Sequence, residues 1–248
     1  MNEHVVLITG ALTGIGRATA LAFADEGNRI VIGGRHQDAG DALISELRGK
    51  NVEAEFLSAD VRNEEDVRGL VDRTVARFGR LDVAVNAAGT EGKPGPLTEQ
   101  TAESYAATFD TNVLGTMLSM KHELRVMKAQ GKGSIVNISS TYGHQGAARA
   151  PVYAASKHAV EGLTRSAALE AAGAGVRVNA VAPGPIQTGL LDRFTGTEEN
   201  KATLASGVPL GRIGTPDEIA RMIVFLGSEA ASFLTGQIVT VDGGKTAG

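Results

Sequence analysis

Cysteine and tryptophan are absent from the 248 residues, and only 4% of the residues are aromatic. Without cysteine the chain cannot form a disulfide, use a thiol as a nucleophile or build a zinc–thiolate site. No apolar run approaches the length of about 20 residues that a membrane-spanning helix needs. The first residues, Met1 to His4, lack the basic leader of a secretion signal. We therefore expect a cytoplasmic protein that makes no contact with a membrane.

A strong charge of one sign is missing as well. The formal net charge is -4, and the 24 basic and 28 acidic residues are interspersed. Because nucleic acids select concentrated basic patches, we expect no nucleic-acid partner. The acidic cluster at Glu64, Glu65 and Asp66 starts a predicted helix, where the helix dipole explains it without a metal. No metal site is predicted.

A hydrophobic content of 42% is present, which is enough for a sizeable core. Short β-branched runs alternate with helical patterns along the chain, and this alternation predicts parallel βαβ units. No linker or repeat divides the chain, so we predict one α/β domain over residues 1–248. The predicted architecture is a three-layer, Rossmann-like, doubly wound parallel sheet of about seven strands with helices on both faces. The predicted strands are 5–9, 29–32, 54–57, 81–85, 133–138, 176–181 and 237–241.

The predicted helices cover residues 17–26, 38–47, 63–78, 102–109 and 113–129, and a further one begins near Pro151. From Gly184 to Gly214, glycine, proline and polar residues interrupt this rhythm. Such a stretch is either a loose loop or a lid. In an enzyme that encloses a cofactor the lid is favoured, here over about residues 185–214.

Three glycines, Gly10, Gly14 and Gly16, stand between the first strand and the first helix. Glycine allows a backbone to approach phosphate groups closely, and a helix N-terminus favours negative charge. The spacing G-x-x-x-G-x-G in the first βα unit therefore predicts a site for the pyrophosphate of a dinucleotide. Simple packing of a strand against a helix is the alternative explanation of these glycines.

The end of the second strand bears on the choice of cofactor. A carboxylate that binds the ribose of NAD is expected about 20 residues after the glycines. Gly33 and Gly34 occupy that place, and Arg35 and His36 follow. An arginine suits the 2′-phosphate of NADP, so the sequence favours NADP(H). An exposed loop arginine is the alternative.

The most informative stretch begins at two serines, Ser139 and Ser140, which end a predicted strand. A helix follows in which Tyr153 and Lys157 lie one turn apart on the same face. The phenol is a general acid, the ammonium favours its ionised form, and a nearby hydroxyl can hold a carbonyl oxygen. Read alone, the pair is also compatible with a helix start that carries a surface tyrosine and lysine.

Together these residues resemble the short-chain dehydrogenase/reductase family over essentially the whole chain. The resemblance rests on eight pieces in order: Thr9-Gly10-x-x-x-Gly14-Ile15-Gly16, Asp60-Val61, Asn86-Ala87-Ala88-Gly89, Asn112, Ser140, Tyr153-x-x-x-Lys157, Pro183-Gly184 and Thr188. Each piece is weak by itself, but their common order and spacing are very specific.

The resemblance implies roles for four catalytic residues. Tyr153 would be the acid and base, and Ser140, rather than the adjacent Ser139, would hold the substrate oxygen. Lys157 would bind the nicotinamide ribose and lower the pKa of Tyr153. Asn112 would kink its helix and hold a water that connects Lys157 to solvent.

The resemblance also implies the binding residues. For the cofactor they are Gly10, Thr13, Gly14, Ile15, Gly16, Arg35, His36, Asp60, Val61, Asn86, Ala88, Gly89, Tyr153, Lys157, Pro183, Gly184, Ile186 and Thr188. For the substrate they are Ser140, Tyr142, Gln145, Ala150 and Leu190. Members that prefer NADP often carry a basic residue where this chain has Thr13, so NAD(H) also remains possible.

The leading hypothesis is a carbonyl reductase or alcohol dehydrogenase that transfers a hydride between NADP(H) and a small-molecule carbonyl or secondary alcohol. The alternatives are a 3-oxoacyl-thioester reductase and, from another class, a non-catalytic regulator that senses a dinucleotide. The intact set of Asn112, Ser140, Tyr153 and Lys157 argues against the regulator. The resemblance further implies a homotetramer.

Overall fold

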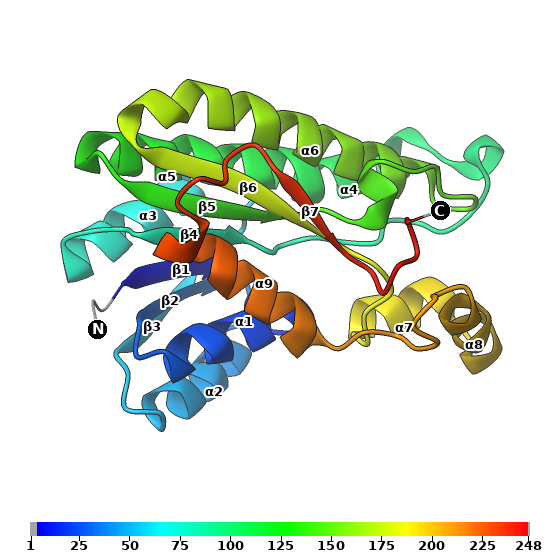
Figure 1. Ribbon diagram of the computed structural model, residues 1–248, viewed down its shortest axis with the longest axis horizontal. Coiled ribbons are helices and arrows are strands. Elements are labelled where there is room, and N and C mark those ends of the chain that lie inside the picture. Colours follow the sequence, from blue (N-terminus) through cyan, green and yellow to red (C-terminus); the bar gives the residue numbers. More distant parts are fainter. Residues whose placement is uncertain (1–3, 248) are drawn as a thin grey trace.

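The computed structural model describes residues 4–247. Residues 1–3 and Gly248 lie outside this range. The prediction about a secretion signal concerns residues 1–4, so most of that segment is outside the described residues. Within residues 4–247, parallel strands form one sheet in the order β3-β2-β1-β4-β5-β6-β7 (Figure 1). The strands are β1 Val5–Thr9, β2 Arg29–Gly34, β3 Ala54–Ser58, β4 Val83–Asn86, β5 Gly133–Ile138, β6 Val176–Pro183 and β7 Ile238–Val241. The predicted doubly wound parallel sheet is confirmed.

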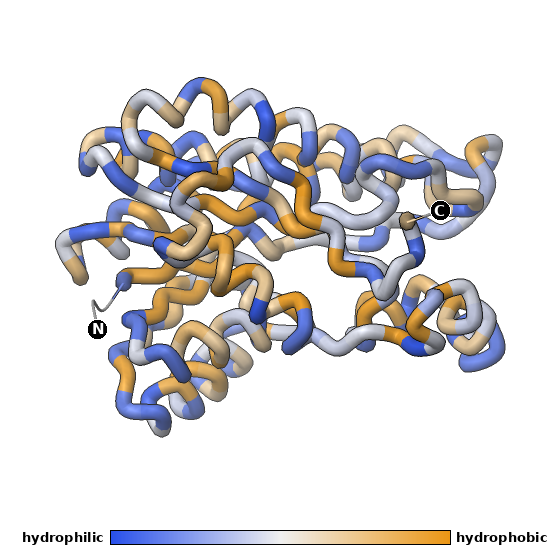
Figure 2. The backbone as a smooth tube through the Cα atoms, in the orientation of Figure 1, coloured by the Kyte–Doolittle hydropathy of each residue, from blue (hydrophilic) through white to orange (hydrophobic). Residues whose placement is uncertain are grey.

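The central strands are apolar on both faces, as strands covered on both sides must be. All five residues of β1 are buried. Val6 and Ile8 pack into one core cluster, whereas Leu7 between them packs into the other. This division follows from the two-residue period of a strand. Figure 2 shows the same pattern, with hydrophobic strands in the middle and more hydrophilic residues on the helices.

Helices cover both faces of the sheet and complete three layers (Figure 1). They are α1 Gly14–Asp25, α2 Gln37–Arg48, α3 Glu64–Phe78, α4 Ala102–Phe109, α5 Gly115–Gln130, α6 Pro151–Ala171, α7 Gly189–Thr195, α8 Glu198–Ser206 and α9 Pro216–Gly227. The face that carries α1 and α9 contains Phe23, Ile219 and Ile223, and the face that carries α5 and α6 contains Met127 and Ala168. Among residues 4–247, no helix combines the length and hydropathy needed to cross a bilayer.

The position of a ligand site follows from the strand order. Moving outward from the centre of the sheet, the chain adds β2 and β3 on one side of β1, then returns to add β4 on the other side. The connections after β1 and β4 therefore leave in opposite directions and open a crevice at the carboxyl ends of these strands.

The helix α9 is absent from the sequence-based prediction. Its start carries a capping box in which the Thr215 hydroxyl accepts from the amide of Glu218, and the Glu218 carboxylate accepts from the amide of Thr215. Pro216 occupies the first helical position, where proline is favoured. These signals were readable in the sequence.

The predicted irregular stretch between Gly184 and Gly214 contains two short helices, α7 and α8. Threonine caps both: Thr188 accepts from the amide of Leu191, and Thr197 accepts from the amide of Asn200. Threonine at an N-cap satisfies amides that the helix itself leaves unpaired. Both helices lie beside the carboxyl ends of the strands, apart from the main body of the sheet (Figure 1).

Candidate active site

A cleft of about 620 Å³ opens at the carboxyl ends of β1 and β4, where the strand order reverses. This volume lies in the range of small-molecule and cofactor sites. Most of the predicted site residues line it. They are Gly10, Thr13, Gly14, Ile15, Gly16, Arg35, His36, Asp60, Val61, Ala88, Gly89, Ser140, Tyr153, Lys157, Pro183, Gly184, Ile186, Thr188 and Leu190.

The turn after β1 brings two backbones into close contact. Gly10 has φ +70°, and a Cβ atom there would lie 2.5 Å from the amide nitrogen of Ala88. Only glycine fits this position without moving the turn after β4. The N-cap of α1, Thr13, makes no capping bond with its side chain, so the first amides of α1 keep their capacity to bind an anion.

The end of β2 presents a cationic edge to the cleft. Arg35 makes no ion pair with any residue between 4 and 247. Its positive charge contributes to the lowered pKa of Asp60, although the main cause is the hydrogen bond from Arg62. Asp60 is therefore already paired with Arg62, through contacts of 2.6 to 3.1 Å. The charge of Arg35 remains for a ligand at this end of the cleft.

Asn112 lies on a π-helical turn, Asp110–Leu114, that joins α4 to α5. A turn of this kind is a frequent feature of functional sites, and it agrees with the predicted kink. Asn112 is 1% exposed and does not line the cleft. Its amide group accepts from the nitrogen of Thr90 at 2.8 Å and donates to the Thr90 carbonyl at 2.9 Å and to the Ser156 hydroxyl at 3.0 Å. These bonds fix Thr90 in the segment after β4, and the expected role of Asn112 in holding a water stays a prediction.

Tyr153 and Lys157 project from the first turns of α6, which begins at Pro151. The Lys157 ammonium lies 5.7 Å from the centroid of the Tyr153 ring and donates a hydrogen bond of 2.8 Å to the carbonyl of Ile138. Ser140 follows β5, and its hydroxyl oxygen accepts from the amide of Tyr142 at 3.2 Å. A phenol, an ammonium and a hydroxyl therefore meet in one cleft.

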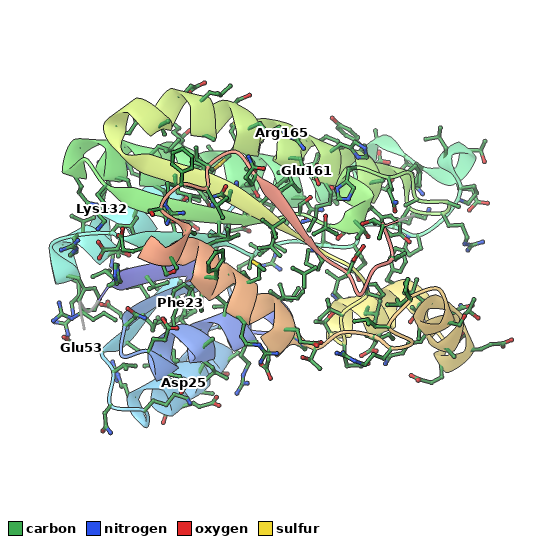
Figure 3. All side chains as sticks on the ribbon, in the orientation of Figure 1. Phe23, Asp25, Glu53, Lys132, Glu161 and Arg165 are labelled. Carbon is green, nitrogen blue, oxygen red and sulfur yellow. The ribbon has the colours of Figure 1, made fainter. Side chains whose placement is uncertain are left out.

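The loop that carries Ser140 is anchored by a buried carboxylate. Glu161 on α6 accepts from the Ser139 hydroxyl at 2.9 Å and contacts Nδ1 of His144 at 3.0 Å. Arg165, one turn further along α6, donates to the same carboxylate at 3.3 Å (Figure 3). Because Ser139 and His144 flank Ser140, this network fixes both sides of its loop.

Burial dominates the titration of the central pair. It raises the pKa of Tyr153 to about 12, and the nearby charge of Glu91 adds to the rise, whereas a hydrogen bond with Ser140 lowers it in part. Burial also lowers the pKa of Lys157 to about 8. Desolvation therefore outweighs the other effects on the pKa of Tyr153 in this structure, and the lowering expected from Lys157 stays a prediction. The phenol keeps its proton at neutral pH, as an acid that protonates a carbonyl oxygen must.

Four other predicted residues do not line the cleft. Asn86 is 3% exposed and its amide donates to Glu123 and Asn137 beneath the sheet. Ala150 is buried at the N-cap of α6. Tyr142 lies 6.3 Å from Phe194 of α7, measured between ring centroids, and Gln145 is half-buried on the adjoining loop.

The sequence analysis assigned no role to Glu91 and Arg193, which form an ion pair at the edge of the cleft. Glu91 lies two residues beyond the motif Asn86-Ala87-Ala88-Gly89 and is buried. It forms a two-bond ion pair with Arg193 of α7, which lines the cleft. No local pattern links positions that lie about a hundred residues apart, so only the fold reveals the pair.

Comparison with known proteins decides the family. The family model described as "Enoyl-(Acyl carrier protein) reductase" matches residues 10–246. The chain is 43% identical to cis-4-hydroxycyclohexanecarboxylate dehydrogenase of Sinomonas cyclohexanicum, over 99% of this chain and 97% of that protein. The chain belongs to the short-chain dehydrogenase/reductase family. It is therefore an oxidoreductase that acts on alcohol and carbonyl groups.

Other members of the short-chain dehydrogenase/reductase family agree closely. Cyclohexanol dehydrogenase of an Acinetobacter species is 38% identical over 99% of this chain and 96% of its own. The 3-oxoacyl-[acyl-carrier-protein] reductase FabG of Thermotoga maritima is also 38% identical, over 98% of each chain. The crystal structure of levodione reductase superimposes with a TM-score of 0.96 at 35% identity, over 98% of each chain. The structure of ElxO with NADP bound gives 0.92 at 37%, over 99% of this chain and 100% of that one.

Proposed function

We propose that this enzyme interconverts a ring ketone and its secondary alcohol with NADP(H), and that Tyr153 is the acid and base. One observation carries the proposal: a protonated phenol, a hydroxyl and an ammonium share a cleft with the glycine-rich turn after β1. The three groups suit the protonation of a carbonyl oxygen, and the turn suits a dinucleotide.

The cleft residues Gly10, Gly14 and Arg35 would hold NADPH, which would supply the hydride for the carbonyl carbon in the direction of reduction. The hydroxyls of Ser140 and Tyr153 hold the carbonyl oxygen and stabilise the negative charge that develops on it. Tyr153 then donates its proton to that oxygen, which leaves a phenolate and yields the alcohol. The buried phenolate is costly, so Tyr153 regains a proton promptly.

Lys157 is the group best placed to stabilise the phenolate and to help return its proton. Its lowered pKa of about 8 means that the ammonium releases a proton more readily than an ordinary lysine does. A Cβ atom at Gly89 would lie 3.7 Å from the Lys157 nitrogen and 3.3 Å from Oδ1 of Asn112, so both side chains meet at this point. Asn112 contributes by holding Thr90 beside the cleft.

NADP(H) is the preferred cofactor in this proposal. Support comes from Arg35, which is cationic, without an ion-pair partner in residues 4–247, and placed at the end of β2 where the ribose 2′-position is expected. NADP or NADPH is bound in the similar structures of ElxO. NAD(H) is the secondary cofactor in this proposal. Thr13 adds no second positive charge for a 2′-phosphate, so the preference for NADP(H) rests on Arg35 and does not exclude NAD(H).

The substrate class is taken from the relatives together with the cleft. Two relatives are named for alcohols of a six-membered ring. Leu190 and Leu191 of α7 supply apolar surface to the cleft that Ser140 and Tyr153 also line. We extend this class to the present enzyme, with α7 and α8 as the substrate lid.

Two alternatives are separated by the same experiment. A reductase of carrier-bound thioesters would need a basic surface at the lid, but Arg193 is paired with Glu91 and Lys201 with Asp192 at 2.8 Å. A dinucleotide sensor would bind cofactor without turnover.

The test is NADPH and NADH oxidation with cyclohexanone, 2-butanone and an acetoacetyl thioester. We expect the highest kcat/KM for cyclohexanone with NADPH. Preferential turnover of the thioester would support the carrier-dependent reaction, and cofactor binding without any turnover would support the sensor.

The assembly and location of the enzyme are also proposals. We propose a single domain over residues 1–248, a homotetramer and a cytoplasmic location, as the family resemblance and the sequence composition imply. Light scattering after size exclusion measures the molar mass directly. A mass near that of one 25.6 kDa chain would reject the tetramer.

A further inference from the structure

The ion pair between Glu91 and Arg193 is a feature that the proposed hydride transfer does not use. Glu91 is 9% exposed and follows β4, and both of its carboxylate oxygens accept from the Arg193 guanidinium of α7, at 2.5 and 3.1 Å. Two parallel bonds fix the plane and direction of a guanidinium group. Although its side chain is exposed, Arg193 is therefore held in one orientation by Glu91.

The held guanidinium keeps donors for another partner. Glu91 engages Nε and Nη2, whereas Nη1 has no hydrogen-bond partner among residues 4–247. An arginine carries five N–H donors and no acceptor. The Arg193 side chain is 63% exposed, so water can accept from the free donors until an oxygen of a ligand replaces it. Arg193 lines the same cleft as Ser140 and Tyr153.

Two further observations place the pair near the reacting end of the cleft. The Glu91 charge contributes to the raised pKa of Tyr153, after the larger effect of burial. The neighbouring residue Thr90 lines the cleft and is held by Asn112. The carboxylate balances the charge of Arg193, so the pair attracts a ligand through directed hydrogen bonds more than through net charge.

We propose that Arg193, oriented by Glu91, donates a hydrogen bond to a second oxygen of the substrate, away from the carbonyl held by Ser140 and Tyr153. The inference rests on the proposed function and narrows its substrate class to ring ketones or alcohols with another oxygen substituent. Arg193 is then a specificity-determining residue and Glu91 is the residue that positions it.

The test compares two substrates of similar size, 4-hydroxycyclohexanone and 4-methylcyclohexanone, with NADPH. The native enzyme should favour the hydroxyketone in kcat/KM by about tenfold or more, since a hydrogen bond to a charged group contributes this much. Arg193→Met keeps the length of the side chain and should bring the ratio to about 1. The matched control is Lys201→Met, which removes the ion pair with Asp192 on the lid and should keep the native ratio.

The ratio separates recognition from a purely structural role. If the pair only fastens α7, Arg193→Met lowers both substrates by the same factor and the ratio stays at its native value, which overturns the proposal. A native ratio near 1 overturns it as well.

A binding measurement keeps this inference distinct from the proposed reaction. In Tyr153→Phe with NADP⁺, calorimetry should show trans-1,4-cyclohexanediol binding about tenfold more tightly than trans-4-methylcyclohexanol, and Arg193→Met should remove the difference. Discrimination in binding without turnover by the native enzyme would refute the reaction and support the role of Arg193. Turnover by the native enzyme without any difference in binding between the two alcohols would support the reaction and refute the role of Arg193.

Discussion

The buried carboxyl group of Glu123 should make the stability of this enzyme fall as the pH rises. Glu123 lies on α5 and is 1% exposed, and the one side-chain hydrogen bond that it makes within residues 4–247 comes from the Asn86 amide at 3.0 Å. Burial raises its pKa from the ordinary 4.5 to about 8, and the hydrogen bond from Asn86 offsets only part of this rise. The folded protein therefore retains this proton over a pH range in which the unfolded chain releases it.

The sign and size of the effect follow from proton linkage. Between pH 4.5 and 8 the unfolded state binds fewer protons than the folded state, so the free energy of unfolding decreases with rising pH. At about 1.4 kcal/mol for each pH unit, the full decrease is about 5 kcal/mol. Glu123→Gln cannot ionise, and its carbonyl oxygen can still accept from Asn86. The variant should gain stability relative to the native protein across this range.

The assay is thermal unfolding at equal protein concentration, followed by far-ultraviolet circular dichroism because the chain has no tryptophan. From pH 5 to 8 about 3.5 kcal/mol of this decrease is realised, so the difference in Tm between Glu123→Gln and the native protein should grow by about 7–14 °C, at about 2–4 °C per kcal/mol. Glu199→Gln, at an exposed position of α8, is the control and should show a constant difference. A difference for Glu123→Gln that does not change with pH would refute the reasoning.

Three further predictions concern the cofactor and the scaffold. Arg35→Met should raise the KM for NADPH by about 10- to 100-fold and leave that for NADH within threefold, and equal changes for both cofactors would reject the 2′-phosphate role. Gly10→Ala should abolish cofactor binding in a calorimetric titration, because its Cβ would lie 2.5 Å from the backbone of Ala88. The control Gly27→Ala has a similar φ, +77°, but no atom within 4 Å of its Cβ, and should bind normally. Asn63→Ala removes the side chain that accepts from two amides at the start of α3. The free energy of unfolding, measured by urea denaturation, should fall by about 1 kcal/mol, whereas Asn63→Asp should keep most of the native stability. Equal losses in the two variants would exclude the capping bond as the cause.

The fold was predictable where a local pattern determines the element. The run from Val5 to Thr9 is β-branched and fully buried, and its predicted bounds match β1. The first turn was predictable for the same reason. Gly10 and Gly14 both have positive φ angles, which the backbone of this turn requires and which glycine adopts without strain. The seven predicted strands all exist, with small differences at their ends.

The remainder depends on signals that are short or distant. The helix α9 escaped prediction although Thr215, Pro216 and Glu218 mark its start, because its strand–helix context was interrupted by the lid region before it. The helices α7 and α8 are short, at 7 and 9 residues, so periodicity gives them little support.

Side-chain placement was the least predictable part of the site. Asn86 occupies the expected position in its motif, yet its amide group donates to Glu123 of α5 and does not line the cleft. The contact between Glu91 and Arg193 joins positions 102 residues apart, and no sequence pattern spans that separation. In both cases the tertiary fold, rather than the local motif, decides the partner.

The most direct test of the central claim is the turnover of Tyr153→Phe with NADPH and cyclohexanone. The substitution removes only the hydroxyl that would hold and protonate the carbonyl oxygen. We predict that kcat falls by about 10²- to 10⁴-fold while the Kd for NADPH stays within threefold of the native value. A kcat within tenfold of native, with normal cofactor binding, would contradict the assignment of Tyr153 as the acid and base.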